Sequence, residues 1–180
     1  MAPQQAPPQD AASTEAASNN ATSKTAAPGQ DPARAAWLGL LARSDPALLA
    51  ARMEALTAEM DPVPTSRWLR APETGSTMIR GRTGGTGAPF NLGEMTVTRC
   101  TLALQDGTVG HAMVPGRDRA HAERVALADA LLCRPATRAM VEREVLAPLT
   151  DAAEAKARDR AEKAEATKVD FFTMVRGEDA

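Results

Sequence analysis

The sequence EMTVTRCTLALQDGTVGHAMV, residues 94–114, contains two extended segments joined by a turn. Residues 94–104 are rich in Thr, Val and Leu, a composition typical of a β-strand. Asp106 and Gly107 form a dipeptide that strongly favours a tight hairpin turn. Residues 108–114 are therefore expected to pair back antiparallel to the first segment, and Pro115-Gly116 to end the sheet.

A glycine-rich stretch, RGRTGGTGAPFNLG, precedes this hairpin at residues 80–93. Glycine loses the most backbone freedom on folding, so a glycine-rich loop is costly to order. Such a loop is expected where φ must be positive or where the backbone must approach another group closely. Further upstream, residues 66–71 and 76–80 have the composition of strands and are separated at Pro72 and Gly75. These segments together predict a small antiparallel sheet.

Two helices are predicted before the sheet. Asp31-Pro32 and Asp45-Pro46 each combine an N-cap residue with proline at the first helical position. Pro62 then ends the second helix, which predicts an αα-hairpin. The apolar residues of the two helices are Trp37, Leu38, Leu40 and Leu41 in the first, and Leu49, Met53, Leu56 and Met60 in the second.

More helices are predicted after the sheet. Asp118 can cap a helix that ends at Arg134-Pro135, and residues 137–149 form the next. Residues 150–168 are almost entirely alanine and charged residues, which predicts a C-terminal helical arm. The fold class is therefore α+β. The inner apolar positions are Ala122, Val125, Ala128 and Leu132 in the first helix and Val141, Val145 and Leu149 in the second.

Three regions are expected along the chain: a disordered tail at residues 1–30, an α+β domain at 31–149, and the helical arm with an apolar anchor at 150–180. The tail has few large apolar residues and cannot offset its ordering entropy. The anchor is expected to insert into a partner chain, and the alternative is that it folds back onto its own sheet. Its candidate partner-binding residues are Phe171, Phe172, Met174 and Arg176.

Composition excludes several classes of protein. The net charge of −2 argues against a general nucleic-acid or membrane-surface binder. Cys100 and Cys133 lack CxxC spacing and are expected to be ordinary thiols in a reducing compartment. No apolar run approaches the roughly 20 residues of a membrane span, and no secretory signal is present, so the expected location is cytoplasmic.

The glycine-rich stretch is the first candidate for anion binding. The backbone N–H groups of Gly84, Gly85 and Gly87 could form a nest for a phosphate, with Arg82 adding positive charge. A Walker A loop would need a lysine, and a Rossmann fingerprint would need a following helix, so neither motif applies. The alternative is a flexible hairpin connection.

Four further side chains are candidates for anion or substrate binding. Arg117 and His121 lie at the start of a predicted helix, where the dipole favours anions; the alternative for His121 is a partly exposed structural residue. Glu94 and Arg99 lie on the 94–104 strand, and the alternative for Arg99 is a solvated strand face. With two histidines in the chain and no PCxxC motif, we expect no metal site.

Five blocks of sequence together resemble the PhnG family, whose members are subunits of the bacterial carbon–phosphorus lyase system. The blocks are RGRTGGTGAPFNLGEMTVTR (80–99), DGTVG (106–110), GRDRAHAE (116–123), DALL (129–132) and KVDFFTMVRGED (168–179). The resemblance implies an α+β fold and a core complex that holds PhnI, PhnH, PhnJ and a second PhnG copy. It implies no catalytic residue of PhnG itself.

The resemblance also implies an activity for the complex. With PhnI, PhnH and PhnL, the family supports displacement of adenine from MgATP by a phosphonate, which gives α-D-ribose 1-methylphosphonate 5-triphosphate. We expect this chain to bind no cofactor of its own and to be inactive alone. Two roles stay open: a subunit that contributes substrate-binding groups, and a scaffold that only shapes and holds PhnI.

Overall fold

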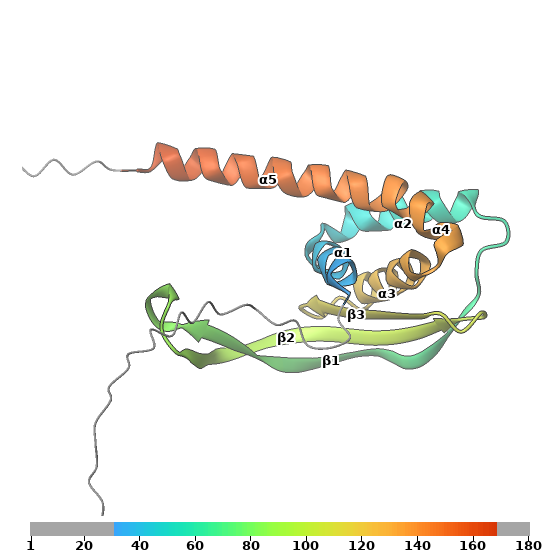
Figure 1. The fold of residues 1–180 in the computed structure, drawn as a ribbon, viewed down its shortest axis with the longest axis horizontal. Coiled ribbons are helices and arrows are strands. Elements are labelled where there is room, and N and C mark those ends of the chain that lie inside the picture. The colour runs from blue at the N-terminus through green and yellow to red at the C-terminus, as the bar shows by residue number, and fades with distance from the viewer. Residues whose placement is uncertain (1–30, 169–180) are drawn as a thin grey trace, which may run out of the picture. The chain divides into compact units, whose positions relative to one another are not determined.

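The computed structural model describes residues 31–168. The tail at residues 1–30 and the anchor at residues 169–180 lie outside the described residues. The predictions made for these two segments are therefore not tested by the structure. The described part is α+β, as predicted from the sequence, with an antiparallel sheet and helices on one of its faces (Figure 1).

The sheet has three antiparallel strands in the order β1 (Ser66–Arg82), β2 (Pro89–Leu104) and β3 (Val109–Pro115). The turn between β2 and β3 is the predicted one: Gly107 has φ of 85°, and the Thr108 N–H donates to Asp106 Oδ1 at 2.9 Å. β3 pairs only with residues 97–103 of β2. The β1–β2 hairpin therefore continues beyond β3 as a two-stranded arm.

Two predicted boundaries in this hairpin are wrong. β1 is one strand that continues through Pro72 and Gly75, with register shifts between Trp68 and Arg70 and between Arg70 and Glu73. An edge strand tolerates proline because its outward backbone groups need no partner, and bulges absorb the irregularity. β2 begins at Pro89, five residues before the expected start, so the connection is only residues 83–88.

The two predicted N-terminal helices are present as α1 (Pro32–Arg43) and α2 (Pro46–Glu59), and both pack against α3. Asp31 caps α1 by accepting from the Ala33 N–H, and Asp45 caps α2 by accepting from two backbone N–H groups. Of the predicted apolar positions, Trp37, Leu41, Leu49, Met53 and Leu56 are buried.

α3 (Arg119–Cys133) packs directly on β2 and β3, and its N-cap is Asp118, as predicted. Gly110 of β3 faces α3 so closely that a Cβ there would collide with the carbonyl of Ala126. The alternating positions of β2 and β3 that face α3 form the core with the inner stripe of the helix. These buried residues include Cys100, Leu102, Leu104, Ala112, Val114, Ala122, Val125, Ala128 and Leu132.

The predicted helix at 137–149 is interrupted. α4 (Pro135–Val141) passes into a π-helical turn (Glu142–Leu146) and then into α5 (Ala147–Ala166). Pro148 has no N–H to give to the preceding turn, which explains the wider turn directly before it. Val141, Val145 and Leu149 are nevertheless all buried, as the sequence predicts.

α5 contacts α1 and the π-helical turn. Residues 150–166 are exposed apart from a half-buried Ala155. The predicted helical arm is therefore present as far as Ala166 (Figure 1). No helix within residues 31–168 combines the length and the hydrophobicity needed to cross a bilayer.

Candidate functional site

The glycine-rich connection lies at the tip of the β1–β2 arm. Gly84 and Gly85 have φ of 58° and 82°, a left-handed conformation that disfavours side chains. Gly87 is tightly placed, since a Cβ there would lie 2.7 Å from the Thr83 carbonyl oxygen. The Gly87 N–H donates to that same oxygen at 2.8 Å. The connection is therefore a defined turn that needs its glycines.

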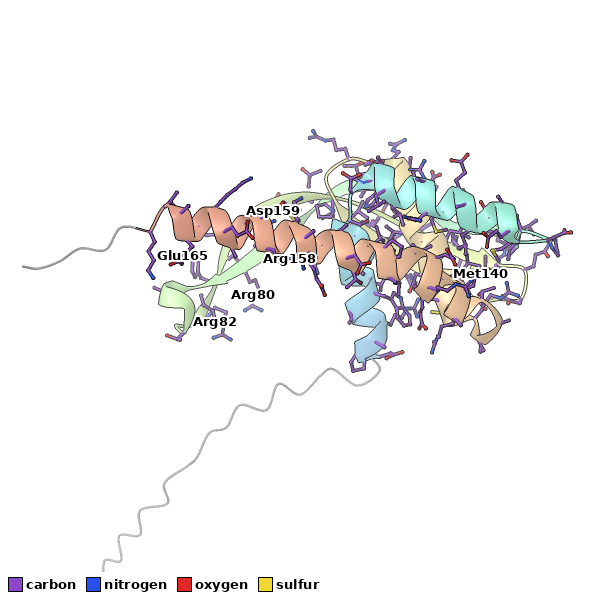
Figure 2. The ribbon with its side chains drawn as sticks, turned by 90° about the horizontal axis from the view of Figure 1, so that it is seen from above. Arg80, Arg82, Met140, Arg158, Asp159 and Glu165 are labelled. Atoms are coloured by element: carbon purple, nitrogen blue, oxygen red, sulfur yellow. The ribbon has the colours of Figure 1, made fainter. Side chains whose placement is uncertain are left out.

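Arg82 closes this turn from the β1 side. Its Nη1 donates to the carbonyl oxygen of Gly87 at 3.1 Å, and the side chain is exposed. Arg80 lies two residues earlier, and Figure 2 shows both arginines at the distal end of the hairpin. The turn consequently carries positive charge at a position where another chain can reach it.

Arg99 lies at the middle of β2, on the face opposite α3. Its Nε donates to Glu73 Oε1 of β1 at 2.8 Å, and Arg70 Nη1 lies 3.5 Å from the same oxygen. Glu73 thus neutralises one of two arginines. Beside them, Thr101 Oγ1 and His111 Nδ1 lie 3.2 Å apart.

An open pocket of about 340 Å³ is lined by Arg70, Arg99, Thr101 and His111, with Glu73 beside it as the partner of both arginines. With two arginines against one glutamate, it carries excess positive charge and suits an anion. Sequence reasoning identified Arg99 but missed the others, because strand pairing between distant segments brings them together. The lining residues include Leu38, Arg70, Arg99, Thr101, His111 and Met113.

A larger pocket, of about 500 Å³, lies between the end of α2 and the β2–β3 turn. Its lining includes Glu59, Asp61 and Asp106 against Arg134, whose Nε lies 2.7 Å from Asp106 Oδ2. The excess of carboxylates disfavours phosphate groups there. Size alone therefore does not identify the better anion site.

Arg117 and His121 lie where β3 passes into α3. Gly116 anchors this passage, because its N–H donates to Thr96 O at 2.9 Å and its carbonyl accepts from Thr98 Oγ1 at 2.8 Å. Arg117 is exposed. Glu94 is exposed and lies two residues beyond Thr96 on β2, and alternation puts both on the same strand face.

His121 is only 3% exposed, so it is more enclosed than a partly exposed structural residue would be. Neither ring nitrogen has a hydrogen-bond partner within residues 31–168. A ligand could reach the ring only if the surrounding side chains moved. Its role in anion binding stays a prediction.

The candidates are distributed over separate regions. Arg82 pairs with Pro89, and Arg99 lies ten residues further along β2. At about 3.3 Å per residue, roughly 30 Å separates these two positions. Glu94, Arg117 and His121 form a third group near the start of α3. The described residues therefore do not converge on one closed site.

The cysteines are free thiols, as predicted, with Cys100 buried and Cys133 half-buried. Burial, followed by the nearby Glu123, raises the pKa of Cys100 to about 11. Burial also raises the pKa of Cys133. Raised values suppress the thiolate, which argues against nucleophilic use of either residue.

Sequence reasoning missed one polar centre entirely. Asp129 is fully buried in the middle of α3 and accepts four hydrogen bonds. The sequence did contain an indication of this centre. Asp129 lies between Ala128 and Ala130 on a helix with an apolar stripe, and a carboxylate buried there needs hydrogen-bond donors. Its donors are Arg34 Nε (3.1 Å) and Nη2 (2.6 Å), Trp37 Nε1 (2.8 Å) and the His111 N–H (2.9 Å).

Comparisons with known proteins agree with the resemblance read from the sequence. The family model described as "Phosphonate metabolism protein PhnG" matches residues 32–177. The chain is 46% identical over 142 residues to the alpha-D-ribose 1-methylphosphonate 5-triphosphate synthase subunit PhnG of Rhizobium meliloti (strain 1021). That alignment covers 78% of this chain and 86% of the relative. The chain therefore belongs to the PhnG family of phosphonate metabolism proteins.

Proposed function

We propose that this chain is a subunit of the complex that transfers a phosphonate onto C1 of the ribose of MgATP. In that reaction the bond from C1 to adenine breaks and a bond from C1 to a phosphonate oxygen forms, with adenine as the leaving group. The proposed partners are PhnI, PhnH, PhnJ and PhnL in the cytoplasm, with MgATP as a substrate of the complex. The name of the 46% identical relative supports a place in this synthase.

One observation supports a subunit role over independent catalysis. The candidate residues lie at the tip of the hairpin arm, in the middle of the outer sheet face and at the start of α3, roughly 30 Å apart at the extremes. An active site needs its groups within hydrogen-bond reach of one substrate. This chain therefore acts by adding groups to a site that a partner completes.

The tip of the arm is the best candidate for such a contribution. Its turn is held in shape by positive φ at Gly84 and Gly85 and by the bond from Arg82 to Gly87. Arg80 and Arg82 are exposed there, where they can meet the triphosphate or the phosphonate in a partner's site. The scaffold role is the alternative, in which the same surface only holds PhnI.

Reconstitution with purified partner subunits distinguishes these roles. Arg82→Ala is expected to assemble normally and to release adenine about 10- to 100-fold more slowly, because a charge-assisted contact is lost. Arg67→Ala is the matched control, since Arg67 is an exposed arginine on the same strand far from the tip. Unchanged turnover with Arg82→Ala would support the scaffold role. The same conclusion would follow if every variant of this chain that loses activity also loses assembly of the complex.

The pocket around Arg99 supports a second anion-binding position. Glu73 contacts both arginines although its charge balances only one of them, so an anion must compete with its carboxylate. Glu73→Gln is expected to tighten binding of inorganic phosphate or methylphosphonate to the chain, and Arg99→Ala to weaken it. Calorimetric titration of both variants measures the difference, and equal affinities would remove this pocket from consideration.

A further inference from the structure

Within residues 31–168, the two edge strands of the sheet differ in whether their outer backbone groups have hydrogen-bond partners. The edge of β3 is covered: Val109 O accepts from Arg34 Nη2 at 3.1 Å, and the His111 N–H donates to Asp129 Oδ2. The outer edge of β1 has no such partner in this part of the chain. Every residue of this 17-residue strand is exposed or half-buried.

The two halves of β1 differ in how well they resist pairing with another strand. The half from Ser66 to Glu73 contains Pro72, two register shifts and the charges of Arg67 and Arg70. Proline, bulges and charge are the devices that protect an edge. Residues 74–79, TGSTMI, contain no proline and no charge, and the next register shift and the next charge follow Ile79, at Arg80. They form an unprotected edge of six uncharged residues.

Exposed apolar side chains surround this unprotected edge. Met78 is 49% exposed and Ile79 38% exposed on β1, and Phe90, Leu92 and Met95 of β2 are 44%, 65% and 37% exposed. An exposed apolar cluster beside an unpaired edge is typical of a site that another strand covers.

The chain itself contains a segment that fits this edge. Residues 169–175, VDFFTMV, combine aromatic and β-branched residues with a single charge, a composition typical of strands. Seven extended residues span about 23 Å, enough to cover residues 74–79. We propose that residues 169–175 of a second copy of this chain add as a strand to the edge of β1 at residues 74–79, with the two copies exchanging these segments.

The position of α5 favours exchange over pairing within one chain. α5 contacts α1 and the π-helical turn, α1 contacts α3, and α3 packs on the sheet. Figure 1 shows α5 across the helical layer from the sheet. Two packing distances of about 10 Å separate α5 from the sheet. Residues 169–175 begin directly after residue 168, so most of their extended length would be needed to reach β1 of the same chain. Little of the segment would then remain to pair along that strand.

Disulfide trapping in the full chain tests this proposal in a Cys133→Ser background. A chain with Met78→Cys mixed with a chain with Phe172→Cys is expected to give a covalent dimer under mild oxidation. The double variant Met78→Cys/Phe172→Cys is expected to give dimers rather than a crosslinked monomer. The matched control replaces Met78→Cys by Leu69→Cys, which is also 49% exposed on β1 but lies in the protected half, and is expected to crosslink about tenfold less.

Sedimentation of uncrosslinked protein provides a second measurement. Truncation after Lys168 and the variant Met78→Lys are each expected to weaken self-association by about tenfold or more, and Leu69→Lys to leave it within about threefold. Crosslinks within one chain, equal yields from the two β1 positions, or self-association unaffected by truncation would each overturn the proposal. In a complex reconstituted with partner subunits, a covalent link from Phe172→Cys only to a partner subunit would overturn it as well.

Discussion

Arg34 of α1 and Asp129 of α3 form a two-point ion pair, with Nε–Oδ1 and Nη2–Oδ2 distances of 3.1 and 2.6 Å. The carboxylate is fully buried, and it also accepts from the indole N–H of Trp37 and from the His111 N–H. One acid therefore joins α1, α3 and the edge of β3. Two elements separated by 95 residues are fixed at a single point.

Replacing Arg34 by alanine leaves this carboxylate without its countercharge. We expect Arg34→Ala to lower the free energy of unfolding by about 3 kcal/mol, the low end for a broken buried pair, because Arg34 is 31% exposed. Arg143→Ala is the control, since its pair with Glu144 lies at the surface, and should cost much less than Arg34→Ala. Urea denaturation measures both, and equal losses would contradict the assigned role of Asp129.

Gly85→Val is expected to destabilise the chain because φ is 82° there, a conformation that costs a side chain about 1–2 kcal/mol. Gly93→Val provides the comparison, since Gly93 lies in β2 with open space around it and should change stability by about 0.5 kcal/mol or less. Thermal unfolding of both proteins checks the difference. Similar melting temperatures would show that the tip does not hold the left-handed conformation.

His121→Leu is expected to leave stability unchanged or to raise it. The ring is 3% exposed and both nitrogens lack partners within the described residues, so burial of the imidazole costs free energy that leucine would avoid. Measuring unfolding and adenine release together separates structure from function. A stable variant with lost turnover would assign His121 a direct role in the reaction, whereas a large loss of stability would reveal a buried partner.

The raised pKa of Cys100 predicts a loss of stability in alkali. The thiol ionises near 9.0 when unfolded and at about 11 when folded, so the folded state keeps its proton after the unfolded state has lost it. The contribution is fully present below pH 9 and disappears as pH rises through about 11, to a limit of roughly 3 kcal/mol. Cys100→Ala should flatten this part of the stability profile, and a profile unchanged by the substitution would contradict the assignment.

Local signals in the sequence predicted the starts of α1, α2 and α3 and the turn between β2 and β3 correctly. Aspartate followed by proline marks the starts of α1 and α2, and Asp118 marks the start of α3, because each carboxylate accepts from nearby N–H groups. These interactions involve residues within three positions of each other. A single sequence displays them directly.

The errors in the sheet and at the polar sites occurred where distant segments decide the conformation. Pro72 and Gly75 read as strand breaks, yet pairing with β2 keeps β1 continuous around them. The pocket of Arg70, Arg99 and His111 depends on the register of all three strands. The partners of Asp129 come from 18 to 95 residues away, so spacing along the chain gives no sign of them.

Beyond Leu149, α5 owes its helical state to local forces. Alanine has the highest intrinsic propensity, and Glu154 Oε2 lies 3.9 Å from Arg158 Nη1 one turn away, but residues 150–166 bury almost nothing. We expect such a helix to be in local helix–coil equilibrium beyond its contacts with the rest of the described chain. Amide exchange should therefore quicken steadily from Leu149 towards Ala166 in the isolated chain. A partner that binds α5 would replace this gradient with uniform protection of the amide protons. The residue at which protection becomes uniform would then mark the start of the binding site.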